Sequence, residues 1–418
     1  MKFPEINTIK NLWDIPTLLA MLLAFSMPIN RLFSSIVIIL MIIHWLFSVN
    51  FRSRFRNFLS IPLSWAFPVL FAWYALGIFY SKDTDASLFD IQVKLPLLIL
   101  PVILLTHGKK IDKKKVILSL IAGLLTAFTI FITIGCIRNY QMHHTFSYLN
   151  PWFFTYILFA NPLSMQPNYI AMYICLGLAF CIKEFFFHKK IKRRLVYSLI
   201  SLLLLFFLIL LSSRSQWICS LLIILSAFFM VEMKKKERIF ALVFFVLGLV
   251  ISVFIVMNNS VSRQHFRETF IQNKHPNPAF SGRENRMVIW TSAINLISEN
   301  PFIGTGNGDV KDELIRIYQE KGFNDGITYQ LNAHNEFLQT AISSGIPAML
   351  FLLFILGYMT YIAIRDKNIL IFSFCITVII SMMTESLLNR QNGVVFIGMF
   401  MSLFIFCLNQ RSNLNDKF

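Results

Sequence analysis

Residues 189–236 read KKIKRRLVYSLISLLLLFFLILLSSRSQWICSLLIILSAFFMVEMKKK. The segment holds two apolar runs that are separated by a short turn around Arg214 and flanked at both ends by clusters of Lys and Arg. A helix that spans a bilayer needs roughly 20 predominantly apolar residues, and loops rich in Lys and Arg stay in the cytoplasm. The segment therefore predicts a helical membrane hairpin that carries Arg214 on the extracytoplasmic side.

The composition of the whole chain agrees with a membrane protein. Of its 418 residues, 56% are hydrophobic and 14% are charged, and the mean hydropathy is +0.64. Soluble domains carry about 25% charged residues. The six cysteines lie in or beside apolar runs and lack the spacing of disulfide frameworks or zinc sites, so we interpret them as small hydrophobic residues: Cys136, Cys175, Cys181, Cys219, Cys375 and Cys407.

The length rule predicts an all-α polytopic membrane protein with about twelve transmembrane helices. We expect these spans at residues 13–29, 31–49, 60–80, 92–107, 116–137, 168–187, 195–211, 217–233, 239–257, 338–364, 369–388 and 393–408. The first apolar run leads directly into a second, so no cleavable signal peptide is expected.

Basic clusters predict the orientation. Those at 52–56, 109–115, 189–194 and 234–238 all fall on one side of the predicted membrane, which places both termini in the cytoplasm. A net charge of +17 would suggest nucleic acid in a soluble protein. Here the cations are spread between apolar spans rather than gathered on one face, so no nucleic-acid partner is expected.

Three regions follow from this topology: an N-terminal membrane region at 1–257 with about nine spans, a long extracytoplasmic loop at 258–335, and a C-terminal membrane region at 336–418 with about three spans. Apolar residues at helical spacing predict a helix at 284–299 inside the loop, and a second short helix is expected at 309–321.

Three residues of the outer face are candidates for phosphate binding. Arg214 is either an interfacial anchor for lipid headgroups or an anion clamp. Arg283 and Arg286 share one face at a helix start, where the helix adds partial positive charge. Either could instead be structural, and Arg286 could pair with a carboxylate such as Glu284.

His334 lies where the long loop re-enters the membrane. A lone His is commonly structural, but an imidazole at the mouth of a membrane cavity is well placed for proton transfer. Glu385, near the outer end of the eleventh predicted span, is a second ionisable candidate and could pair with Arg390.

Two further motifs have simpler interpretations. Gly304, Gly306 and Gly308 resemble a dinucleotide fingerprint, but no strand precedes them, so we interpret them as a hinge or tight turn. Asp83 and Asp85 resemble a metal-binding pair, but a helix cap is the preferred interpretation. The predicted spans hold very few charges near their centres, which disfavours an ion-coupled transporter.

The order of these features resembles the O-antigen ligase family of bacterial enzymes. The matching motifs run from about 195 to 365, and the N-terminal half matches only as a set of spans. The motifs are Ser213-Arg214 with Trp217, Gly282-Arg283 with Trp290, Asn300-Pro301 with the three glycines, His334-Asn335-Glu336-Phe337-Leu338 with Gly345, and, more weakly, Pro167-Asn168-Tyr169.

This resemblance implies an inverting, metal-independent glycosyltransferase of the bacterial inner membrane. It would move a glycan from undecaprenyl pyrophosphate to a hydroxyl of lipid A-core or another acceptor at the periplasmic face, without a cofactor. His334 would be the base, Arg214, Arg283 and Arg286 would bind the pyrophosphate, and supporting roles are expected for Asn335, Glu336, Glu385 and Arg390. A polysaccharide polymerase and a protein O-oligosaccharyltransferase remain open alternatives, as does a lipid or polysaccharide transporter from a different class.

Overall fold

The computed structural model describes residues 14–47, 55–56, 58–61, 63–106, 111–145, 149–231, 239 and 286–415. Within these ranges the chain is helical and contains no strand. The α-helices are α1 (Ile15–Ser26), α2 (Arg31–Phe47), α4 (Ala66–Leu76), α5 (Thr84–Lys94), α6 (Pro96–Thr106), α7 (Lys113–His143), α8 (Tyr156–Ala160), α9 (Pro167–Phe187), α10 (Ile191–Leu210), α11 (Arg214–Met230), α14 (Arg286–Glu299), α15 (Val310–Glu320), α16 (Asn324–Thr328), α17 (Glu336–Arg365), α18 (Ile369–Thr384) and α19 (Gln391–Asn415). Short 3-10 turns include η2 (Gly77–Phe79), η3 (Pro151–Phe154), η4 (Asn161–Leu163) and η6 (Leu387–Asn389).

The helices confirm an all-α membrane protein. Five helical stretches among the described residues are long and apolar enough to cross a bilayer, namely Thr84–Thr106, α7, α9, α10 and α17. Shorter apolar helices occupy most other predicted spans. The predicted span at 239–257 lies outside the described residues apart from 239, so the total of about twelve stays a prediction. The predicted span at 369–388 ends earlier than expected, because α18 stops at Thr384.

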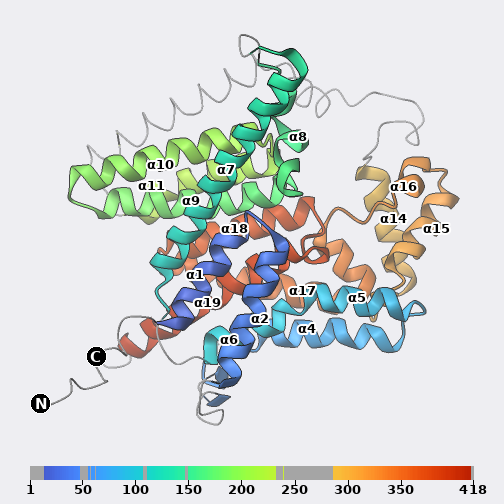
Figure 1. Ribbon diagram of the computed structural model, residues 1–418. Helices are drawn as coiled ribbons and strands as arrows, with labels where there is room; N and C mark the ends of the chain where they lie inside the picture. The colour runs from blue at the N-terminus through green and yellow to red at the C-terminus, as the bar shows by residue number, and fades with distance from the viewer. Residues whose placement is uncertain are drawn as a thin grey trace, which may run out of the picture.

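Helix α9 is mostly buried and packs against α7, α10, α11 and α18 (Figure 1). Its 21 residues measure about 31 Å at 1.5 Å per residue. Near its C-terminal end, Glu184 forms an ion pair with Lys114 at the start of α7, and its carboxylate lies 3.0 Å from Nε2 of His188. The basic clusters at 113–115 and 189–194 therefore meet at one end of α9, and Asn168 lies at the other.

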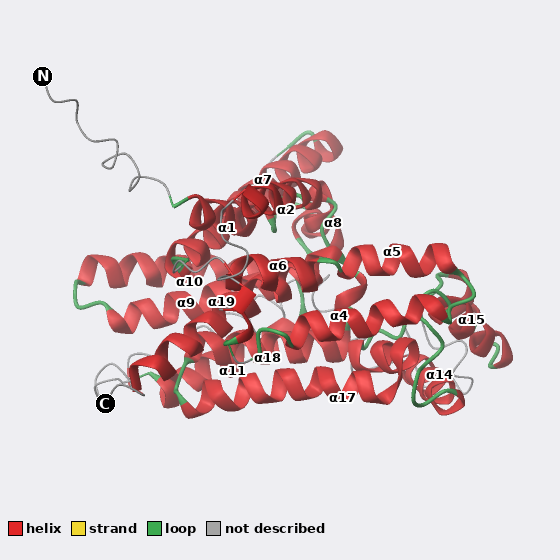
Figure 2. Ribbon diagram, turned by 90° about the horizontal axis from the view of Figure 1, so that it is seen from below, coloured by secondary structure: helices red, strands yellow, loops and turns green. Residues whose placement is uncertain are grey.

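Helices α14, α15 and α16 form a smaller unit, which we interpret as extramembrane because it falls within the predicted extracytoplasmic loop. Figure 1 shows these helices, in gold and orange, together at one end of the molecule near α5. Figure 2 shows α5 and α15 at that same end, and α4 running alongside α17. The unit has its own hydrophobic cluster around Ile289, Leu314 and Phe323. The helices predicted at 284–299 and 309–321 are confirmed as α14 and α15, except that 284–285 lie outside the described residues.

The glycine run forms a tight turn that packs against a break in α17. Gly304 and Gly306 have φ values of +73° and +91°, which favour glycine. The amide of Thr305 donates to the Ile342 carbonyl at 2.7 Å. Helix α17 is interrupted at Gly345, where φ is 84° and ψ is 166°. A Cβ at Gly345 would lie 2.1 Å from the Phe302 carbonyl oxygen, so the two backbones are in direct contact and leave no room for a side chain.

Asp83 caps a helix, as preferred from the sequence. Its carboxylate accepts a hydrogen bond from the Ala86 amide at 2.9 Å, at the N-terminus of α5. The turn before it is held by Asp309, whose carboxylate accepts from the amides of Lys82 and Asp83. These contacts join the start of α5 to the start of α15.

Candidate active site

His334 occupies a strained turn directly before α17. Its φ is 44°, in the left-handed region that few non-glycine residues adopt. The turn is held by the Asn332 side chain, which accepts from the His334 amide at 3.0 Å. Asn335 then caps α17 by accepting from the amides of Phe337 and Leu338. These contacts hold the imidazole at the helix start, with its side chain only 16% exposed.

The Nδ1 atom of His334 faces Glu385. The distance from Nδ1 to Oε2 of Glu385 is 3.6 Å, and Nδ1 is buried with no closer hydrogen-bond partner. Glu385 is the residue that follows the last turn of α18. The carboxylate considered from the sequence as a partner for Arg390 therefore faces the candidate base instead.

A chain of hydrogen bonds links Glu385 to the turn that carries Arg214. The Asn168 amide donates to Oε1 of Glu385 at 2.7 Å. The Ser213 hydroxyl in turn donates to the Asn168 side-chain oxygen at 2.9 Å. Ser213 is the N-cap of α11, and Arg214 is the first residue of that helix. Residues from the N-termini of α9 and α11 and from the C-terminus of α18 thus meet beside His334.

Glu385 is held in its charged form. Its burial would raise the pKa of the carboxyl group, but the neighbouring His334, the hydrogen bond from Asn168 and the charge of Arg286 together lower it below its ordinary value of 4.5. The carboxylate is therefore ionised at neutral pH, which suits a group that orients an imidazole and stabilises it when protonated.

Three arginines lie at or near this cluster in the described part of the chain. Arg214 is exposed at the start of α11, and Arg286, half-buried, is close enough to Glu385 to affect its ionisation. Arg390 is exposed and acts electrostatically on Tyr169, the neighbour of Asn168. Arg283 lies outside the described residues. Permanently charged guanidinium groups with several donors are well suited to phosphate groups.

Helix termini add to the positive potential. α9 begins at Pro167, α11 at Arg214, α17 at Glu336 and α19 at Gln391, and each of these residues adjoins a member of the cluster or Arg390. A helix N-terminus carries partial positive charge and unpaired amide groups. Helix N-termini next to the cluster favour an anion such as pyrophosphate.

Glu336, also predicted as a supporting residue, has a structural position. Its side chain is buried and accepts hydrogen bonds from the Leu388 amide at 2.7 Å and from the Thr340 hydroxyl at 3.1 Å. It therefore ties η6, which lies between Glu385 and Arg390, to the first turn of α17. Asn335 likewise serves as a cap. Both residues hold the framework on which His334 and Glu385 lie.

Asn168 was missed as a site residue. The only sequence signal was its place in Pro167-Asn168-Tyr169 before a predicted span, and an uncharged amide there does not stand out.

Asp83 and Asp85 belong to the cap of α5. Within the described ranges, no group of three or more His, Cys, Asp or Glu side chains is placed to hold a metal ion.

Comparison with known proteins gives one result for the region that contains this site. Residues 199–353 match the family model described as O-Antigen ligase. None of the curated proteins matches the chain. The matched region includes Arg214, Arg286 and His334, and it ends within α17. The match supports the resemblance drawn from the motifs: residues 199–353 of this helical membrane protein are similar to the O-antigen ligase family.

Proposed function

We propose that this protein is a glycosyltransferase that moves a glycan from undecaprenyl pyrophosphate to an acceptor hydroxyl at the periplasmic face of the bacterial inner membrane. It acts as a ligase for a surface polysaccharide such as O-antigen. The observation that carries this proposal is the His334–Glu385 pair, which lies among arginines and helix N-termini.

In this scheme His334 is the general base. The acceptor oxygen forms a bond to the anomeric carbon while the bond from that carbon to the pyrophosphate oxygen breaks. The hydroxyl proton passes to Nε2 of His334, since Nδ1 faces Glu385. The carboxylate of Glu385 then stabilises the imidazolium. Attack opposite the leaving group inverts the anomeric configuration, and no glycosyl-enzyme intermediate is formed.

The arginines bind the leaving group and stabilise its negative charge. Pyrophosphate departs with the bonding electron pair, so negative charge grows on its bridging oxygen. Arg214 and Arg286 neutralise that charge, together with Arg283 from the preceding segment and with Arg390. Fixed donors aimed at developing charge are commonly the largest catalytic contribution. A pyrophosphate is also a weak base, so the scheme requires neither a strong general acid nor a metal ion.

Two substitutions test the mechanism. We expect Arg214→Ala and His334→Ala to lower transfer of glycan by at least about 100-fold, the usual scale for loss of a charge-stabilising group or a general base. Transfer is measured with purified protein in nanodiscs and lipid-linked glycan extracted from membranes. Arg365→Ala and His188→Ala are matched controls, because both residues lie far from the cluster, one at the C-terminal end of α17 and the other just after the C-terminal end of α9. Wild-type transfer by either test variant would remove that residue from the mechanism.

A gene deletion separates a ligase from a polymerase. Loss of all surface-attached glycan, with long chains retained on the lipid carrier, is the result expected of a ligase. A single repeat unit that remains attached to the surface acceptor would instead identify a polymerase. Intact surface glycan with altered lipid export would contradict transfer altogether and favour a transporter.

A further inference from the structure

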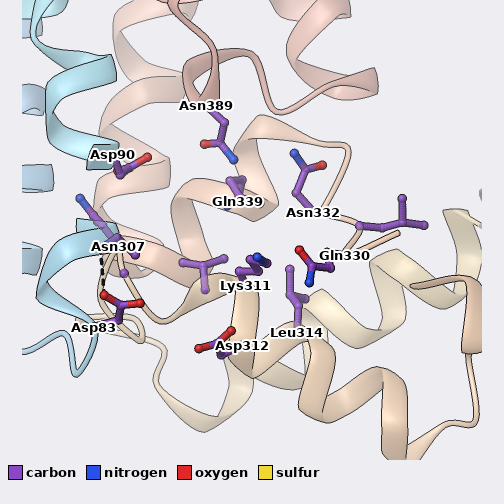
Figure 3. A pocket seen from close by; sticks show the side chains of 14 residues that line it. Asp83, Asp90, Asn307, Lys311, Asp312, Leu314, Gln330, Asn332, Gln339 and Asn389 are labelled. Atoms are coloured by element: carbon purple, nitrogen blue, oxygen red, sulfur yellow. Dashed lines mark hydrogen bonds between the residues drawn. The ribbon is translucent and has the colours of Figure 1, made fainter. Parts of the chain in front are cut away.

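A polar cavity lies beside the turn that precedes His334 and the 3-10 turn that follows Glu385, although neither of these two residues lines it. Its volume is about 290 Å³, and it is bordered by α5, α15, the turn at 330–332, the first turns of α17 and η6. Five carboxamide side chains line it (Figure 3): Asn307, Gln330, Asn332, Gln339 and Asn389. Figure 3 shows Asn332, Gln339 and Asn389 gathered around one space, although they come from three separate segments.

The lining suits a sugar better than a phosphate. A carboxamide both donates and accepts hydrogen bonds, as does a sugar hydroxyl. The carboxylates in the lining include Asp90 and Asp312, while Lys311 is its sole ammonium group. Asp90 is in turn paired with the buried Lys94. The cavity therefore lacks the excess of positive charge that pyrophosphate requires, and that excess lies instead at Arg214, Arg286 and Arg390.

The cavity is coupled to the candidate base through the backbone. Asn332 lines the cavity and also accepts from the His334 amide at 3.0 Å. Gln339 lines it as well and accepts from the Ala333 amide at 3.2 Å. Asn389 lies four residues after Glu385 in the chain. A ligand held by these three amides would contact the segments that position both members of the catalytic pair.

We propose that this cavity binds a neutral sugar unit of the acceptor, adjoining the unit whose hydroxyl reaches His334. The proposal rests on the proposed function and adds a division of the site to it: the donor pyrophosphate lies on the arginine side of His334, and the acceptor sugar lies on the amide side. At about 290 Å³ the cavity is at the lower limit of small-ligand pockets, which span roughly 300–1,000 Å³, so it suits a single sugar ring rather than a longer glycan.

Filling the cavity tests this division. Ala86 lines it from α5, on the same helix face as Asp83 and Asp90. We expect Ala86→Trp to raise the KM for the acceptor about tenfold and to leave the KM for the donor unchanged, because a filled subsite loses ground-state binding of one substrate. Leu88→Trp is the matched control, since Leu88 lies on the same helix outside the cavity lining and is 54% exposed. Its kinetics should equal those of the wild type.

The probe is the glycan-free acceptor extracted from a strain that lacks the gene, titrated against the full-length protein in nanodiscs. A smaller change, Asp312→Ala, should raise the KM for the acceptor about threefold. This second variant keeps the test informative if the Trp variant does not fold. An increase in the KM for the donor alone would assign the cavity to the donor glycan and overturn the proposal, as would unchanged kinetics in both variants. Failure of the proposed function is distinct, because the wild type would then transfer no glycan at all.

Discussion

In the proposed mechanism, the contact between Glu385 and His334 orients the imidazole. The 3.6 Å between Nδ1 and Oε2 is longer than a hydrogen bond, yet catalytic hydrogen bonds are often long before substrate binds and shorten in the complex. The backbone of His334 is held by the Asn332 side chain, and the side chain of Glu385 is held by Asn168. A small closure of this contact on substrate binding would align the imidazole for proton transfer.

Replacement of Glu385 by Gln should lower kcat strongly with little effect on KM. The amide keeps the shape of the side chain but cannot stabilise an imidazolium, and a comparable change in a Ser-His-Asp triad costs about 10⁴-fold in kcat. We expect a loss between about 100-fold and that value, measured as initial rates of glycan transfer at saturating donor. Glu320→Gln on the exposed end of α15 is the control. A Gln variant with wild-type kcat would show that Glu385 only holds the fold.

Among the elements, α17 and the glycine turn behave as one unit. The break at Gly345 lets the first turns of α17, which follow His334 directly, lie against the backbone of residues 301–306. The Ile346 amide donates to the Pro301 carbonyl at 2.7 Å, so the contact continues past the break. The position of the candidate base therefore depends on a contact between two backbones.

Gly345→Ala should disturb both stability and transfer. A Cβ there would meet the Phe302 carbonyl oxygen at 2.1 Å, and the residue would have to keep a φ of +84°. This combination of φ and ψ is essentially restricted to glycine, and it costs another residue about 1–3 kcal/mol before any clash is added. We expect a lower melting temperature in detergent and a loss of glycan transfer. Gly357→Ala in the same helix is the control, because nothing lies within 4 Å of its Cβ position. Equal melting temperatures for the two variants would contradict a tight backbone contact at the Gly345 break.

The ion network of α15 gives the extramembrane unit a pH-dependent contribution to stability. Arg316 contacts Glu313 at 2.8 Å, Glu299 at 2.7 Å and Glu320 at 2.8 Å. The hydrogen bond from Arg316 is the main reason that the pKa of Glu313 lies below its ordinary value of 4.5. A lowered pKa means that the stabilisation is present above pH 4.5 and is lost as the pH falls through the folded-state pKa.

Arg316→Met should therefore weaken the unit at neutral pH but not in acid. The side chains are partly exposed, so the change is about 1 kcal/mol or less. Hydrogen exchange of the α14 and α15 amides should be faster in the variant than in the wild type at pH 7, after correction for intrinsic rates. The difference should shrink toward pH 4. A difference that persists unchanged in acid would mean that the packing of the Arg316 stem, and not its charge, holds the helices.

At the scale of the whole molecule, the candidate site and the basic clusters occupy opposite ends of α9. Asn168 and Glu385 lie at one end, and Lys114 pairs with Glu184 at the other. If the basic end is cytoplasmic, as the distribution of cations predicts, the site faces the periplasm. This is where a finished lipid-linked glycan and its acceptor would meet.

Cysteine labelling tests this orientation. A membrane-impermeant maleimide should modify Asp312→Cys in intact spheroplasts and should modify Lys190→Cys only after lysis, because the two positions lie on opposite sides. Both side chains are exposed. Four of the native cysteines in the described part of the chain are buried and Cys136 is partly buried, and the unsubstituted protein reports their background. The reverse labelling pattern would invert the topology.

Much of this architecture could be predicted from the sequence because the governing signals are local. Apolar length predicts the spans, and Asp83 before an acidic first turn predicts a cap. The site was predictable only where a residue carries charge in an unexpected place, as with Arg214 and His334. The role of Asn168 was not, because it depends on two hydrogen-bond partners 45 and 217 residues away. The same holds for Glu336, because its hydrogen bond to η6 joins residues that are distant in the sequence.

The lock between Gly345 and the glycine turn also limits how this protein can be recombined with relatives. The extramembrane helices look like a cassette that could be exchanged at the membrane boundary. The turn at 300–306, however, packs on the backbone of 342–346, and Gly306 and Gly308 approach Ser81 and Asp83 closely. A chimaera intended to change acceptor preference should therefore take residues 300–347 as one block, together with the turn before α5.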